Sequence, residues 1–115
     1  MEKLELYRQY VQQVLTQYAK VPSASKEIET QLAFDTVRDH YSVSSVGWKG
    51  MRRYHGQIIH IDIKNGKIWI QHDGTERGIA SDLEELGVPK SDIVLGFHAP
   101  YKRPYTDYAT GDEAA

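Results

Sequence analysis

The sequence predicts an α+β fold built from one short chain of 115 residues. Apolar residues recur at steps of three and four over residues 3–19 and again over residues 79–86, and this spacing predicts two helices. Between them, residues 29–48 and the segment around Asn65-Gly66 alternate with a period of two, which is typical of strands. We therefore expect an antiparallel sheet of four or more strands, with an N-terminal and a C-terminal helix packed on one face.

The strongest local signal is a hairpin centred on Asn65-Gly66, a dipeptide that accepts the positive φ angles of a type I′ turn. A two-residue loop pairs Asp62 with Trp69 and His60 with Gln71. One face of the hairpin then carries only isoleucines, at positions Ile59, Ile61, Ile63, Ile68 and Ile70. We expect this face to pack on the helices, and we expect the face with His60, Asp62, Trp69 and Gln71 to be left to solvent or to a partner.

The second helix has recognisable signals at both ends. Asp73 and Thr75 precede it, and we expect one of them to cap its unpaired N–H groups. Gly87 follows it and is expected to adopt a left-handed conformation at the C-terminus. Residues 93–95, Ile-Val-Leu, are apolar and predict a short buried strand or extended segment.

Composition excludes several classes of function. The chain has no cysteine, which removes disulfides, thiolate nucleophiles and cysteine zinc sites. Its net charge of −2 gives no general attraction for nucleic acid, although a local basic patch remains compatible with it. No apolar run approaches the length of a membrane span. These features predict a soluble, cytoplasmic protein without membrane association.

No catalytic or metal-binding set is predicted. The five residues with suitable side chains are His60, Asp62, His72, Asp73 and Glu76. Strand alternation places His60 and Asp62 on one face and His72 on the other, so we expect no metal site formed by two or more of them. The Asp73–Gly78 loop lacks the pattern of a phosphate-binding loop. We therefore expect no catalytic residue and no cofactor.

A run of basic and aromatic side chains offers a candidate contact surface. It comprises Trp48, Lys49, Arg52, Arg53 and Tyr54. Such side chains contact phosphates and stack on bases, and they are also enriched at protein interfaces. A purely structural alternative is a solvated loop with Trp48 buried at its base. The candidate surface for a partner or a nucleic acid combines this run with His60, Asp62, Trp69 and Gln71.

The amino-acid sequences of several segments resemble those of the XisI family of cyanobacteria, the controlling factors for excision of the fdxN DNA element. The resemblance rests on His-Ile-Asp-Ile at 60–63, Ile-Trp-Ile-Gln at 68–71 and Gly-Val-Pro-Lys at 87–90, and it extends from the first helix to Ala109. It implies one XisI-like domain over residues 1–115, of which about 101–115 form a polar tail containing tyrosines. That tail is expected to dock on its own domain, with contacts to a protein or to nucleic acid as the alternatives.

The resemblance also implies a function in DNA recombination during heterocyst development. A separate recombinase exchanges the strands, and XisI acts with a XisH-like companion protein as a regulatory, non-catalytic factor. Homo-oligomer formation and direct DNA contact are left open. Two alternatives remain: a small DNA-binding accessory protein, and a cryptic metal-dependent hydrolase or nuclease that uses His60, Asp62, Asp73 and Glu76.

Overall fold

The computed structural model describes residues 2–21 and 26–112 of the chain. Two helices, five strands and two 3-10 helices follow one another in these residues. Their order is α1 (Glu2–Ala19), β1 (Ile28–Asp35), β2 (His40–Lys49), β3 (Arg52–Lys64), β4 (Lys67–Asp73), α2 (Ile79–Glu85), η1 (Lys90–Asp92), β5 (Ile93–Leu95) and η2 (Pro100–Tyr105). The fold is α+β, as the sequence predicts.

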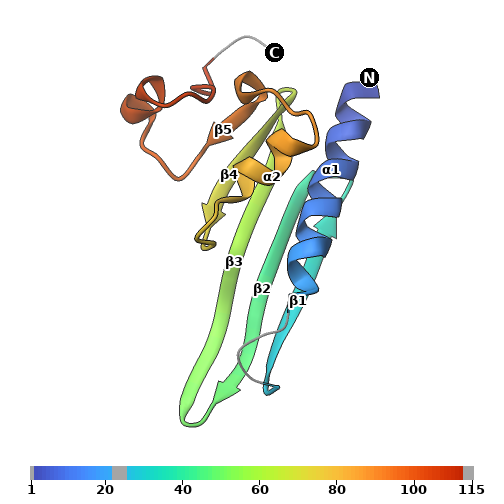
Figure 1. Cartoon of the computed structure of the whole chain (residues 1–115), viewed down its shortest axis with the longest axis vertical. Coiled ribbons are helices and arrows are strands. Elements are labelled where there is room, and N and C mark those ends of the chain that lie inside the picture. The colour runs from blue at the N-terminus through green and yellow to red at the C-terminus, as the bar shows by residue number, and fades with distance from the viewer. Residues whose placement is uncertain (1, 22–25, 113–115) are drawn as a thin grey trace.

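The five strands form one sheet in the order β1-β2-β3-β4-β5 (Figure 1). Strands β1 to β4 are antiparallel neighbours, but β5 runs parallel to β4. The expectation of a purely antiparallel sheet is therefore wrong. The reason is the connection: α2 and η1 lie between β4 and β5, and such a crossover returns the chain to the same end of the sheet before the next strand begins.

Tight turns set the register of the long strands. Asn65 and Gly66 have φ angles of 55° and 76°, as a type I′ turn requires. The predicted pairs from Lys64 with Lys67 down to Ile61 with Ile70 are all present. The next predicted pair is wrong, because a β-bulge beyond Ile61 places His60 opposite His72 instead of Gln71.

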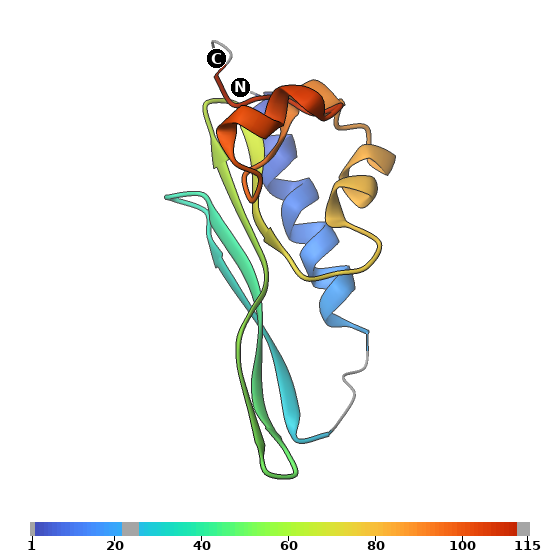
Figure 2. The ribbon, with the colours of Figure 1, turned by 90° about the vertical axis from the view of Figure 1, so that its left-hand side faces the viewer.

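The isoleucine face of the sheet forms the core of the protein. Ile59, Ile61, Ile68 and Ile70 are fully buried, and Ile63 is nearly so. They belong to one cluster with Tyr7, Val11, Val14 and Leu15 of α1 and with Ile79, Ala80 and Leu83 of α2. Figure 2 displays both helices on the same side of the sheet. Burial of apolar area on this side supplies the main driving force for folding.

Two buried aspartates tie α1 to other parts of the fold. Arg8 of α1 donates two hydrogen bonds to Asp39, from Nε at 2.8 Å and from Nη2 at 3.1 Å, and Tyr41 donates a third. The hydrogen bonds from Arg8 hold the pKa of Asp39 below its usual range, although burial opposes them. Tyr7 donates a hydrogen bond to Asp92 in η1. The N-terminal helix is thereby fixed to the β1–β2 turn and to η1, which leads into β5.

The start of α2 is stabilised from a distance. The N-cap residue is Gly78, which has no side chain to cap with. Asp73 fills the role, because its Oδ2 accepts the N–H of Ile79 at 2.7 Å and its Oδ1 accepts the N–H and hydroxyl of Thr75. Thr75 in turn accepts the N–H of Gly78. The sequence predicts that Asp73 or Thr75 caps this helix; in the structure both side chains accept N–H groups at its start, although neither is the N-cap residue.

The end of α2 is a Schellman motif with Gly87 at φ +106°. The N–H of Gly87 donates to the Glu84 carbonyl, and the N–H of Val88 donates to the Leu83 carbonyl. We expect Gly87→Val to lower the free energy of unfolding by about 1–2 kcal/mol, because a branched side chain is strained at this φ angle. Urea unfolding measures the change, and a free energy of unfolding equal to that of the unmodified protein would contradict the prediction.

No helix in the described part of the chain combines the length and the apolar character that crossing a membrane requires.

Candidate functional site

Strands β2 and β3 extend beyond the rest of the sheet as an arm. Strand β4 pairs only with residues 59–64 of β3, and β1 reaches only to Gly47 of β2. The last part of the arm is a two-stranded hairpin over residues 48–54, which we call the hairpin tip (Figure 1). At its base, the Trp48 N–H donates a hydrogen bond to the Glu27 carbonyl. It turns at Gly50-Met51, where Gly50 has a φ of 61°.

The hairpin tip presents its aromatic and basic side chains to solvent. Met51 is 98% exposed and Trp48 is 49% exposed, so the alternative with Trp48 buried at the base is wrong. The guanidinium of Arg53 lies 5.5 Å from the Trp48 ring centre, and that of Arg52 lies 4.9 Å from the Tyr54 ring centre. Such contacts hold long side chains in place while their charge stays accessible.

A second group of candidate residues lies on the polar face of the sheet. Asp62 accepts a hydrogen bond from Gln71 Nε2 on its Oδ2, at 3.2 Å. Its Oδ1 faces two imidazoles: His60 Nε2 at 2.9 Å and His40 Nδ1 at 2.7 Å. Burial acts to raise the pKa of Asp62, but the hydrogen bond from His40 and the interactions with His60 and Gln71 outweigh it and lower that pKa.

His40 is the residue of this group that sequence reasoning missed. It begins β2 and lies directly opposite Asp62 in the β2–β3 pairing. Three atoms lie within 4.8 Å of one another: one imidazole nitrogen of His40, one of His60 and one carboxylate oxygen of Asp62. A depression of about 220 Å³ lies beside the two imidazoles. Polar side chains, among them Ser42 and Gln57, and the aromatic rings of Phe34 and Tyr41 line the rest of this depression.

Trp69 does not belong to an open surface. Its side chain is 9% exposed and clusters with Val94 and Ala109. Ala109 bridges to Val94 beside β5, which brings this part of the C-terminal segment back against the sheet. The expectation that the Trp69 side of the sheet is left to solvent or a partner is therefore wrong at this position.

Arg103 fastens this returning segment. Its guanidinium lies 5.2 Å from the Trp69 ring centre and donates hydrogen bonds to the carbonyls of Gly96, His98 and Thr110. The described part of the tail, which ends at Asp112, docks on its own domain, as expected. The tyrosines of η2 take no part in this docking, and Tyr105 is 90% exposed.

The residues named for a hydrolase are not brought together. Asp73 lies opposite Ile59, and both of its oxygens are engaged at the start of α2. Among the described residues, the group that can share an ion consists of His40, His60 and Asp62, without Asp73 or Glu76. The set His60, Asp62, Asp73 and Glu76 is therefore not a site in this fold.

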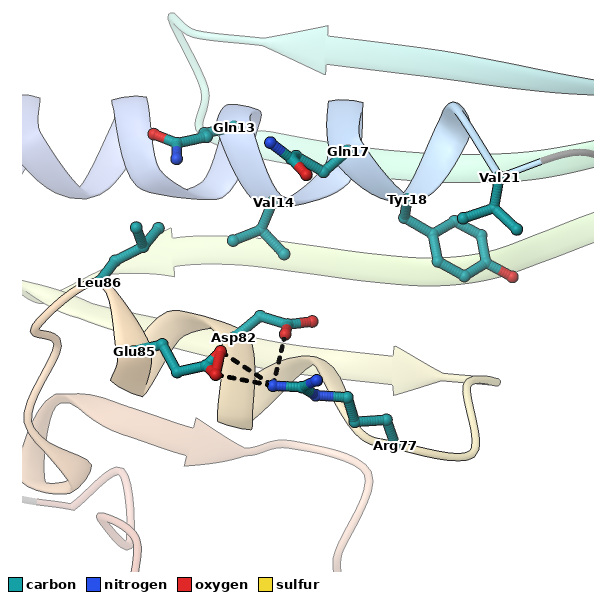
Figure 3. Close-up of a pocket in the computed structure, with 9 residues that line it drawn as sticks. All are labelled: Gln13, Val14, Gln17, Tyr18, Val21, Arg77, Asp82, Glu85 and Leu86. Atoms are coloured by element: carbon teal, nitrogen blue, oxygen red, sulfur yellow. Dashed lines mark hydrogen bonds and ion pairs between the residues drawn. The ribbon is translucent and has the colours of Figure 1, made fainter.

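A surface groove of about 410 Å³ lies between α1 and α2 (Figure 3). Gln13 and Gln17 line its α1 side, and Arg77 crosses its other wall. One Arg77 nitrogen lies 3.3 Å from Asp82 and 2.9 Å from Glu85. These ion pairs are largely exposed. In them the charged side chains of the groove neutralise one another. None of the candidate residues from the sequence lines this groove.

These features define a class of protein: an α+β domain with a mixed five-stranded sheet, helices and an extended hairpin arm. The chain belongs to the XisI family, because the family model described as XisI protein matches residues 1–110. A comparison with curated proteins gives no match.

Two solved structures have the same fold. One is a XisI-like protein from Anabaena variabilis, with 48% sequence identity and a TM-score of 0.87 over 92% of this chain and 97% of that one. The other is the fdxN element excision controlling factor XisI from the same species, with 36% identity and a TM-score of 0.82 over 94% of this chain and 98% of that one. The family predicted from the sequence motifs is confirmed.

Proposed function

We propose that this chain is a non-catalytic regulatory factor that acts through a protein partner in the excision of a DNA element. Its family membership supports this, since one relative is an excision controlling factor at 36% identity. The partner we propose is a XisH-like companion, which the family resemblance implies. The recombinase would then perform the chemistry, and this chain would contribute recognition.

The hairpin tip is the observation that carries the proposal. It places Trp48, Met51 and Arg53 at the end of an arm. Their side chains are exposed there and take no part in the core. Tryptophan, methionine and arginine are enriched at the centres of protein interfaces. Arg53 is already held against Trp48, so less side-chain freedom is lost when a partner binds.

Alanine substitution at the tip tests the proposal. We expect Trp48→Ala and Arg53→Ala each to weaken binding of the XisH-like companion by about 1–2 kcal/mol, because hot-spot residues lose that much on truncation. The dissociation constant then rises about 5- to 30-fold. Isothermal titration calorimetry with the purified companion from the same organism measures it.

The β1–β2 turn supplies matched controls. Val37 and Arg38 are also an exposed apolar and an exposed basic side chain at a hairpin turn, and Val37 is 84% exposed. Val37→Ala and Arg38→Ala should leave companion binding unchanged. Equal binding by all four variants would refute the tip as the partner surface, and a companion that binds none of the proteins, the unmodified chain included, would refute the partner.

A second candidate function is DNA contact by the same tip. Lys49, Arg52 and Arg53 form no salt bridge with other residues that the structure describes, so their charges are free for phosphates. Three such contacts would give a slope of about −2.7 for log K against log salt concentration, and removing one should reduce it by about 1. Salt-independent or undetectable DNA binding would exclude this candidate.

A further inference from the structure

The polar face of the sheet carries three side chains arranged as metal ligands. The antiparallel pairing of β2 and β3 places His40 opposite Asp62, and His60 lies two residues before Asp62 on the same strand. Residues two apart on a strand share a face. All three side chains therefore project from one side of the sheet, away from the isoleucine core.

We infer that His40, His60 and Asp62 form a binding site for one divalent transition-metal ion of the zinc type. This goes beyond the proposed regulatory function and is independent of it. It also replaces the sequence-based expectation of no metal site, which considered His60 and Asp62 without the strand that brings His40 to them.

The distances fit an ion of this size after a small adjustment. Ligand atoms around tetrahedral zinc lie about 2.0–2.2 Å from the metal and hence about 3.3 Å from one another. The two imidazole nitrogens now lie 2.7 Å and 2.9 Å from the same Asp62 oxygen. Separation by about half an ångström, within the reach of side-chain rotation, admits the ion among them.

The donor types select the metal. Two imidazoles and one carboxylate suit Zn²⁺, Co²⁺, Ni²⁺ and Cu²⁺, whereas Mg²⁺ and Ca²⁺ prefer oxygen ligands alone. Asp62 is also oriented for the task, because Gln71 holds its second oxygen and leaves Oδ1 directed at the histidines. Hydrogen bonds of this kind to a ligating carboxylate are a regular part of metal sites.

The site keeps an open side. The His40 side chain is 57% exposed and that of His60 is 31% exposed, while the Asp62 side chain is 15% exposed. The depression of about 220 Å³ adjoins both imidazoles. Three protein ligands with an accessible fourth position leave room for a water molecule or for a donor atom from another molecule.

Titration of the metal-free protein tests the inference. The full chain, free of any histidine tag and pretreated with EDTA, is titrated with ZnCl₂ by calorimetry and with CoCl₂ by visible absorption. We expect one equivalent of each ion to bind, the cobalt form to show d–d bands, and MgCl₂ to give no binding. His40→Ala and His60→Ala should each weaken Zn²⁺ binding at least tenfold.

Two further variants separate a built site from general surface binding. His72→Ala removes an exposed histidine on the neighbouring strand and should leave the affinity unchanged. Gln71→Ala removes the hydrogen bond to Asp62 and should weaken binding about tenfold, with circular dichroism confirming an intact fold. Absence of stoichiometric binding, or equal affinity in the His40, His60 and His72 variants, would overturn the site.

Discussion

Trp69→Ala is expected to lower the free energy of unfolding by about 3–5 kcal/mol, the range for truncating a large buried aromatic side chain. Trp69 is 9% exposed and packs against Val94 and Ala109. A Cβ atom on Gly111 would lie 2.5 Å from the indole ring, so the chain passes directly over it. The loss removes the support on which the C-terminal segment rests.

Trp69→Phe is the matched control. The indole nitrogen is buried and makes no hydrogen bond to the residues that the structure describes, so replacing it by a phenyl ring forfeits no such bond. We expect a clearly smaller loss than for alanine, because the aromatic contacts with Lys64 and Arg103 are kept. Chemical unfolding measures both variants. A loss below about 1 kcal/mol for Trp69→Ala would mean that the C-terminal segment does not cover this ring in solution.

The burial of Trp69 also explains what sequence reasoning could and could not reach. Local rules predicted both helices, the Asn65-Gly66 turn and the isoleucine core face, because each depends on residues close together in the chain. The burial of the Trp69 side chain depends on residues 103–111, which pack against it after the crossover to β5. No periodicity marks such a return, so the sequence alone predicts that the Trp69 ring lies on an open surface.

The parallel pairing of β5 was beyond the sequence for a related reason. Its three residues, Ile93–Leu95, give too short a pattern to define a partner strand or a direction. The direction follows from where α2 and η1 deliver the chain, and this is decided by tertiary packing.

The candidate site was only half visible in the sequence. His60 and Asp62 stand out because they are two apart on a strong strand pattern. His40 is 22 residues from Asp62, and their contact depends on the register of β2 against β3, which shifts at a bulge between Val43 and Ser44. One added residue in a ladder changes every pairing beyond it, and nothing in the local sequence fixes its position.

Gly47→Ala is expected to lower the free energy of unfolding by about 2–5 kcal/mol. Gly47 has a φ of +149°, where side chains are strained, and an added Cβ would overlap the Glu27 carbonyl oxygen and lie 2.9 Å from the Ile28 Cα. The first effect costs about 1–2 kcal/mol and the second about 1–3 kcal/mol. Both neighbouring atoms belong to backbone, so neither can rotate away. The first strand would have to move from its place beside β2.

Two other glycines of the same hairpin arm divide this cost into its parts. Gly50 has a φ of +61° but open space around it, so Gly50→Ala should lose only the conformational share, about 1–2 kcal/mol. Gly56 has neither a positive φ nor a close neighbour, so Gly56→Ala should be neutral or stabilising by up to about 1 kcal/mol. Urea unfolding of the three variants gives the ranking. Equal losses for Gly47→Ala and Gly50→Ala would mean that β1 does not approach β2 at Gly47, because the difference between them is the contact with the backbone of Glu27 and Ile28.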